Sequence, residues 1–107
     1  MNELQTSGYN LIMDEVRQDD IEHDPWGTAT TWLFAMADVV WLREGELLPE
    51  YGPSPMGLTE SAITETHAGE RILRMYDDED IDRDDINAAY AVLSRFADMA
   101  TANGRGY

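Results

Sequence analysis

The stretch TATTWLFAMADVVWLR, residues 28–43, is the most apolar part of the chain and decides the fold. Its apolar residues recur at the spacing of an α-helix, and Gly45 supplies a stop shortly after it. One face of this predicted helix should lie in the core, and it carries Ala29, Trp32, Leu33, Met36 and Val40.

The opposite side of the same helix is also apolar. Phe34 and Trp41 lie seven residues apart on it, with Thr31 and Asp38 beside them. A helix that is apolar nearly all round needs cover on both faces. Either the other elements of a small bundle wrap it completely, or the side that carries Phe34, Asp38 and Trp41 faces a partner. These three residues are therefore the candidate partner-binding site.

Three further amphipathic segments surround this helix, at about residues 8–22, 59–76 and 84–102. The sequence HDPWG, residues 23–27, should break the chain before the central helix, because Pro25 disfavours helix at the residue before it. Residues 44–58 contain three Pro and three Gly, which predicts a long connection without regular structure. Its apolar side chains indicate that it packs down and is ordered.

These segments predict an all-α fold: a compact bundle of about four helices, with the ordered Pro/Gly-rich connection between the second and third helices. The 107 residues, 43% of them hydrophobic, are enough for a single helical domain over 1–107 with its own core. No segment shows the alternation and turn chemistry of a β-hairpin.

The chain is strongly acidic, with 22 Asp and Glu against 7 basic residues, all of them Arg, and a net charge of −15. This balance excludes direct binding to nucleic-acid phosphates or anionic membranes, because both need a basic patch. The acidity itself has three interpretations: a solubility or halophile adaptation, an electrostatic surface for a partner, or mimicry of a nucleic acid. With no Cys, disulfides, thiolate zinc sites and thiol nucleophiles are excluded.

Two segments hold most of the negative charge: residues 1–24 and residues 77–85 each carry seven acids and one Arg. The candidate acidic surface consists of Asp14, Asp19, Asp20, Asp77, Asp78, Asp80 and Asp82. Part of the second segment also has a local structural use, since Asp82 or Asp84 can cap the helix that follows.

The alternating aspartates of residues 78–84 resemble a calcium loop, but the register fails. A loop that starts at Asp80 has Asp85 at position 6, where a Gly is needed, and Ala91 at position 12, where a Glu is needed. The sequence therefore predicts no specific calcium site.

No constellation typical of an enzyme is present. His23 and His67 are 44 residues apart and have no second His at ligand spacing, and His67 should be a solvated residue on a polar helix face. No Ser sits in a nucleophile elbow, and no glycine loop could hold a phosphate. We therefore expect no catalytic residue, no cofactor and no metal. The N-terminus lacks a signal peptide and no apolar run could span a bilayer, so a cytoplasmic location is expected.

Two stretches, WLFAMADVVWLREGELLPEYGPSPMG (32–57) and AYAVLSRFADMATANGRGY (89–107), together resemble small acidic proteins without an assigned activity. Such proteins are encoded by bacteriophages of high-GC Gram-positive hosts and by those hosts. The resemblance rests on an apolar Trp-containing helix, the loop Pro49-Glu50-Tyr51-Gly52 and a final helix resembling VLSRFAD. It implies a shared fold and a phage accessory role in the host cytoplasm, and it carries over no catalytic residue.

The leading hypothesis is a small helical interaction factor, monomeric or homodimeric, that binds and modulates a host protein, with or without a basic surface. The alternative is a DNA-mimic inhibitor of a nucleic-acid-binding or defence protein, in which the two acidic segments present carboxylates to a basic groove. The DNA-mimic hypothesis is favoured if these segments share one elongated face, and it is disfavoured if they are scattered.

Overall fold

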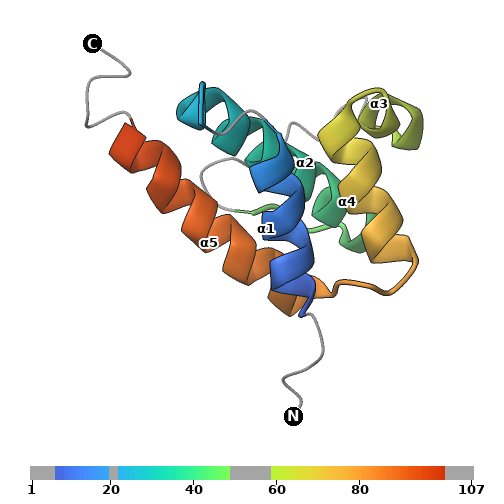
Figure 1. Cartoon of the computed structure of the whole chain (residues 1–107). Helices are drawn as coiled ribbons and strands as arrows, with labels where there is room; N and C mark the ends of the chain where they lie inside the picture. Colours follow the sequence, from blue (N-terminus) through green and yellow to red (C-terminus); the bar gives the residue numbers. More distant parts are fainter. Residues whose placement is uncertain (1–6, 20–21, 49–58, 101–107) are drawn as a thin grey trace.

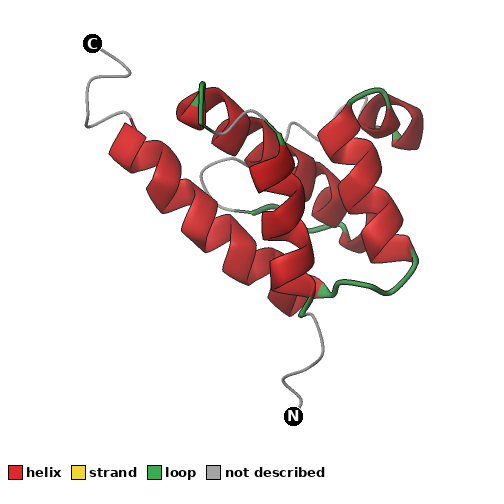
Figure 2. Ribbon diagram, in the orientation of Figure 1, coloured by secondary structure: helices red, strands yellow, loops and turns green. Residues whose placement is uncertain are grey.

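The computed structural model describes residues 7–19, 22–48 and 59–100, and within them every regular element is an α-helix. The helices are α1 (Gly8–Gln18), α2 (Pro25–Glu44), α3 (Glu60–Thr64), α4 (His67–Asp77) and α5 (Arg83–Ala100), as Figure 1 and Figure 2 show. The all-helical prediction is confirmed for these residues. Most of the predicted connection, residues 49–58, lies outside the described residues, so its order stays a prediction.

The central helix is α2, which packs against each of the other four helices (Figure 1). Its predicted inner face is confirmed as core, because no surface is exposed on Ala29, Trp32, Leu33, Met36 and Val40. Fully buried side chains also come from the helices around it: Ile12, Ile72, Ile86 and Leu93. Each large apolar side chain buried in this way stabilises the fold by about 1.5–3 kcal/mol.

The boundaries of α1 and α2 differ from the prediction at their junction. α1 ends at Gln18 because Asp19 adopts an extended backbone. α2 begins at Pro25, which was expected to lie in the break. The Asp24 carboxylate accepts a hydrogen bond from the Gly27 N–H at 3.0 Å and caps the helix, and Pro is well tolerated in a first turn because its missing N–H has no partner there.

The prediction of a single helix over residues 59–76 is wrong, because the chain breaks into α3 and α4. Thr66 adopts an extended backbone, and its hydroxyl accepts a hydrogen bond from the Gly69 N–H at 3.0 Å, which caps α4. Gly69 is buried, and a Cβ there would lie only 2.2 Å from the Ile63 carbonyl oxygen. The glycine therefore permits the end of α3 to pack directly on the first turn of α4. This break turns four predicted helices into five.

The turn from α4 to α5 contains a strained residue. Glu79 has a φ of +65°, the left-handed region that glycine usually occupies. The Asp80 N–H donates to the Met75 carbonyl at 2.9 Å, and the Glu79 N–H donates to the Tyr76 carbonyl at 3.1 Å. This is the Schellman pattern that ends a helix, formed here without glycine.

α5 begins with two aspartates that cap it reciprocally. The Asp82 carboxylate accepts a hydrogen bond from the Asp85 N–H, and the Asp85 carboxylate accepts one from the Asp82 N–H, both at 3.0 Å. Of the two capping residues considered from the sequence, Asp82 is the one that caps.

Arginine–carboxylate pairs join helices that are distant in the sequence. Four pairs among the described residues do so: Arg71 with Glu15 at 2.6 Å between α4 and α1, Arg43 with Asp77 at 2.7 and 2.9 Å between α2 and α4, Arg43 with Glu60 at 3.1 Å between α2 and α3, and Arg83 with Glu44 at 2.7 Å between α5 and α2. Partly exposed pairs of this kind contribute about 0–1 kcal/mol each, so their main effect is to fix how the helices are aligned.

Candidate functional site: an aromatic face on the central helix

The outer side of α2 carries a surface that we call the α2 face: Phe34, Asp38 and Trp41. The three residues stand at i, i+4 and i+7, so they follow one another along the same side of the helix. The Phe34 side chain is 48% exposed, while Asp38 and Trp41 are half-buried. The other elements therefore do not wrap α2 completely. The first arrangement considered from the sequence, in which the bundle covers this helix on all sides, does not hold at Phe34.

Asp38 is the electrostatically unusual member of the α2 face. Burial raises the pKa of its carboxyl above the ordinary value. No hydrogen bond or ion pair joins Asp38 to another residue in the described part of the chain. A half-buried carboxylate without a donor is costly to keep charged, so a donor or cation brought in by a partner would stabilise it.

The two described residues of the acidic surface predicted in the first segment are engaged within the protein. Asp14 forms an exposed ion pair with Arg17 at 2.7 Å. Asp19 accepts a hydrogen bond from the indole N–H of Trp32 at 2.9 Å. Asp20 lies outside the described residues.

In the second segment the predicted surface residues divide into two kinds. The guanidinium of Arg43 hydrogen-bonds Asp77 and holds the pKa of that carboxyl below its ordinary value, and Asp82 caps α5. Asp78 and Asp80 are exposed, and their carboxylates have no partner among the described residues. Four of the six described residues of the predicted acidic surface are thus engaged in intramolecular contacts.

Asp19 of the first acidic segment and Asp85 of the second lie at opposite ends of α1. Gly8 starts this helix directly against the second segment, since a Cβ at Gly8 would lie 2.0 Å from the Asp85 carboxylate. α1 then runs away from that point to Asp19 in the first segment (Figure 1). The length of the helix therefore separates Asp19 from Asp85.

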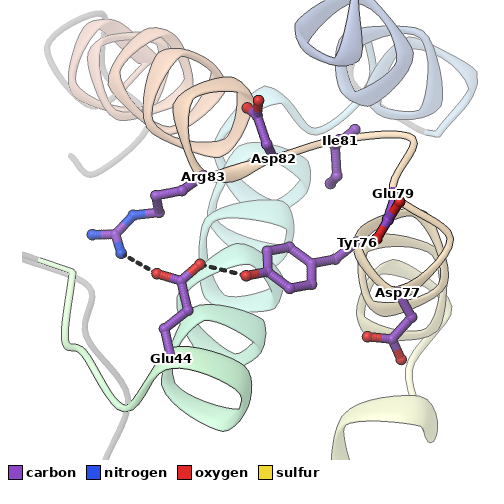
Figure 3. Close-up of a pocket in the computed structure, with 7 residues that line it drawn as sticks. All are labelled: Glu44, Tyr76, Asp77, Glu79, Ile81, Asp82 and Arg83. Carbon is purple, nitrogen blue, oxygen red and sulfur yellow. Dashed lines mark hydrogen bonds and ion pairs between the residues drawn. The ribbon is translucent and has the colours of Figure 1, made fainter.

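A pocket of about 510 Å³ opens where α2 ends, α4 ends and α5 begins (Figure 3). The Tyr76 hydroxyl donates to one Glu44 oxygen at 2.5 Å, and Arg83 binds the other at 2.7 Å. The hydrogen bond from Tyr76, helped by Arg83, lowers the pKa of Glu44, and the same bond raises the pKa of Tyr76. Sequence reasoning missed this cluster, because Glu44 lies 32 and 39 residues from its two partners and that spacing carries no signal.

A second hollow, of about 370 Å³, lies between α1 and α4 and is lined by Glu15, Gln18, Asp19, His67 and Arg71. His67 is exposed, as predicted, and its ring meets Trp32 edge-on, with the centroids 6.1 Å apart. Nothing in the spacing of these two residues indicated this ring contact.

Within the described residues, no three His, Asp or Glu side chains are grouped so that they could hold a metal ion. None of the helices described is long and apolar enough to cross a membrane. Comparison with protein-family models, curated proteins and solved structures finds no match to this chain. The fold and the site define an acidic, all-helical protein whose central helix carries a partly exposed aromatic face.

Proposed function

We propose that this protein is a small interaction factor that binds and modulates another protein through the α2 face. One observation carries the proposal: a phenylalanine that is 48% exposed stands one helical turn from a half-buried carboxylate without a partner in the described residues. Both side chains project from the central helix, whose other side is fixed in the core. Binding surfaces on rigid elements lose little conformational freedom when a partner docks.

The chemistry of the α2 face defines the kind of partner it fits. Phe34 and Trp41 need an apolar pocket, and aromatic anchors of this type dominate the binding energy of many interfaces. Asp38 needs a hydrogen-bond donor or a cation next to that pocket. A net charge of −15 attracts partners with a basic surface over a longer range and raises the rate of encounter.

The resemblance to phage-encoded acidic proteins suggests the setting in which such a factor works. The partner is then a host protein with a basic rim around an apolar pocket, met in the host cytoplasm. The factor acts by occupying that pocket and needs no cofactor and no catalytic residue.

A DNA-mimic inhibitor is the alternative, and the described residues give it less support. A mimic needs carboxylates that are free to meet a basic groove along one continuous face. Here Asp14, Asp19, Asp77 and Asp82 are engaged within the protein, and the length of α1 separates Asp19 from Asp85.

An affinity pull-down from host lysate, followed by binding measurements on the captured protein, tests the proposal. We expect Phe34→Ala and Trp41→Ala to weaken binding by about 2 kcal/mol or more, roughly thirtyfold. Phe96→Ala is the matched control, because Phe96 on α5 is 40% exposed and its loss removes the same side chain from another surface. Full-strength binding by folded Phe34→Ala and Trp41→Ala proteins would show that the α2 face is not the site.

A further inference from the structure

The exposed side of α5 differs from the rest of this acidic surface. From Asn87 to Ala97 the only charged residue is Arg95, in a chain that carries 22 acids. The five other arginines in the described residues form ion pairs with carboxylates: Arg17, Arg43, Arg71, Arg74 and Arg83. Arg95 is exposed and has no ion pair with any described residue. Between Asn87 and Ala97, this side of α5 therefore repels another strongly acidic molecule less than a surface that carries carboxylates does, although Asp84 and Asp98 flank it.

Exposed residues follow one another along one side of α5: Asp84, Ala88, Ala91, Arg95 and Asp98. We call the first four of them the α5 stripe. Their spacing of four, three and four residues keeps them on one side of the helix, as in the seam of a coiled coil. With a rise of 1.5 Å per residue, the stripe is about 16 Å long. Its two ends carry opposite charges, and its two central side chains are small.

The α5 stripe is complementary to itself only when two copies run antiparallel. With a twofold axis between Ala88 and Ala91, Asp84 of each copy faces Arg95 of the other, and the alanines meet at the crossing. In a parallel pair, by contrast, Asp84 would face Asp84 and Arg95 would face Arg95. The small side chains at the crossing allow the helix axes to approach to about 8 Å.

Apolar surface adjoins the α5 stripe. Val92, Phe96 and Met99 follow one another at i, i+4 and i+7 beside it. Phe96 is 40% exposed and Met99 is 63% exposed. An antiparallel contact along the α5 stripe would bury part of this row, which adds a hydrophobic contribution to the two charge pairs.

From this arrangement we infer that the protein forms an antiparallel homodimer through the α5 stripe, with a second copy of the chain as the occupant. This goes beyond the proposed function, since the α2 face lies on another helix and is not part of the contact. A seam of three helical turns is small compared with the roughly 1,200 Å² that stable complexes bury, so the dimer is expected to dissociate in the micromolar range.

Sedimentation equilibrium on the full chain, from about 10 μM to 1 mM, tests this inference. An ionic strength of about 0.15 M limits long-range repulsion between the copies to a Debye length of about 8 Å. We expect a concentration-dependent dimer, and we expect Arg95→Glu and Asp84→Arg each to raise the dissociation constant about tenfold or more. The combined charge exchange Asp84→Arg/Arg95→Asp should restore the dimer, because the pairs form again with reversed signs.

Arg74→Glu is the matched control: its side chain is 60% exposed on α4, and the substitution changes the net charge by the same amount as Arg95→Glu. This variant and Phe34→Ala should dimerise like the wild type. A protein that is monomeric throughout the concentration range would overturn the inference, and so would a dimer that Arg95→Glu leaves unchanged. Loss of the dimer in Phe34→Ala alone would place the contact on the α2 face instead.

Discussion

The indole N–H of Trp32 donates a hydrogen bond to the Asp19 carboxylate at 2.9 Å, and this bond ties the end of α1 to the centre of α2. Trp32 is fully buried, so its N–H needs an acceptor within the protein. From the sequence, Asp19 was a member of an acidic surface. In the structure it also accepts the hydrogen bond from the indole N–H of Trp32, the largest fully buried side chain of the described core.

Asp19→Ala is therefore expected to destabilise the protein by about 1–3 kcal/mol, because it leaves the buried indole N–H without an acceptor. Asp19→Asn removes the same charge but keeps an oxygen, so it should cost much less. Asp14→Ala is the control for an exposed acid of α1. Urea unfolding measures the free energy of unfolding of the three variants. An Asp19→Ala protein as stable as Asp14→Ala would mean that the hydrogen bond contributes nothing to stability.

Asp38 should make the fold less stable at neutral pH than at acidic pH. Burial raises its pKa in the folded state, so between its ordinary and its folded pKa the folded protein binds more protons than the unfolded chain, and stability rises as the pH falls through the folded pKa. Asp38→Asn should then stabilise the protein at pH 7. This gain should vanish at pH values below the ordinary pKa of Asp.

Thermal unfolding between pH 3 and pH 7 measures the effect of Asp38→Asn. Asp78→Asn removes the same charge from an exposed position and corrects for the relief of general repulsion. If the two variants gain equally at pH 7, the burial of Asp38 has no influence on stability. Asp38→Asn should also weaken binding to the partner, because only the charged Asp38 carboxylate gains strongly from a donor or cation that the partner brings.

Glu44 should show the opposite pH dependence. Its pKa is lowered, first by the hydrogen bond from Tyr76, so its contribution is present above the ordinary pKa and is lost as the pH falls through the folded pKa. Tyr76→Phe should cost about 1–2 kcal/mol at pH 7 and progressively less below pH 4. Thermal unfolding against pH measures this difference, with Tyr9→Phe as the control for a partly buried tyrosine on another helix. A loss that is constant over the whole pH range would contradict the assignment.

The left-handed conformation of Glu79 predicts a stabilising substitution. Glycine adopts this φ without the penalty of about 1–2 kcal/mol that other residues carry, although it loses about 0.5–1 kcal/mol through its freer unfolded state. Glu79→Gly should therefore stabilise the protein by up to about 1 kcal/mol, measured by urea unfolding. Glu79→Gln removes the charge without adding a glycine, so it measures the effect of the charge alone. This effect should account for little of the gain in stability. A destabilised Glu79→Gly protein would show that the turn is not strained.

The elements that periodicity defines could be predicted, and those that depend on a local break could not. The inner face of α2 followed from residues such as Trp32 and Met36 at helical spacing, and both are fully buried. The break before α4 was missed because Thr66 lies inside a pattern that looks continuous, and its cap is recognisable only once its hydroxyl is seen to accept the Gly69 N–H. Asp82 could be considered as a cap, as an alternative to Asp84, because capping is local, whereas the bond that Asp85 returns to Asp82 was not foreseen.

The contacts between helices were beyond the sequence for a different reason. Trp32 and Asp19 are 13 residues apart, and Arg83 and Glu44 are 39 apart. Only the packing of the helices brings them together, and in a chain with 22 acids every arginine has many possible partners. The α2 face could be proposed because its three residues share one helix, whereas its exposure could be learned only from the fold.

The most direct test of the α2 face compares affinity and its salt dependence for the captured partner. Calorimetric titrations at about 0.05 M and 0.5 M salt should show a Phe34→Ala protein that binds roughly thirtyfold more weakly at both concentrations. An Asp78→Asn/Asp80→Asn protein should differ from the wild type only at low salt, because exposed charges act through long-range attraction. Undiminished binding by folded Phe34→Ala, together with loss of binding in the Asp78→Asn/Asp80→Asn protein, would contradict the aromatic anchor and favour the acidic surface.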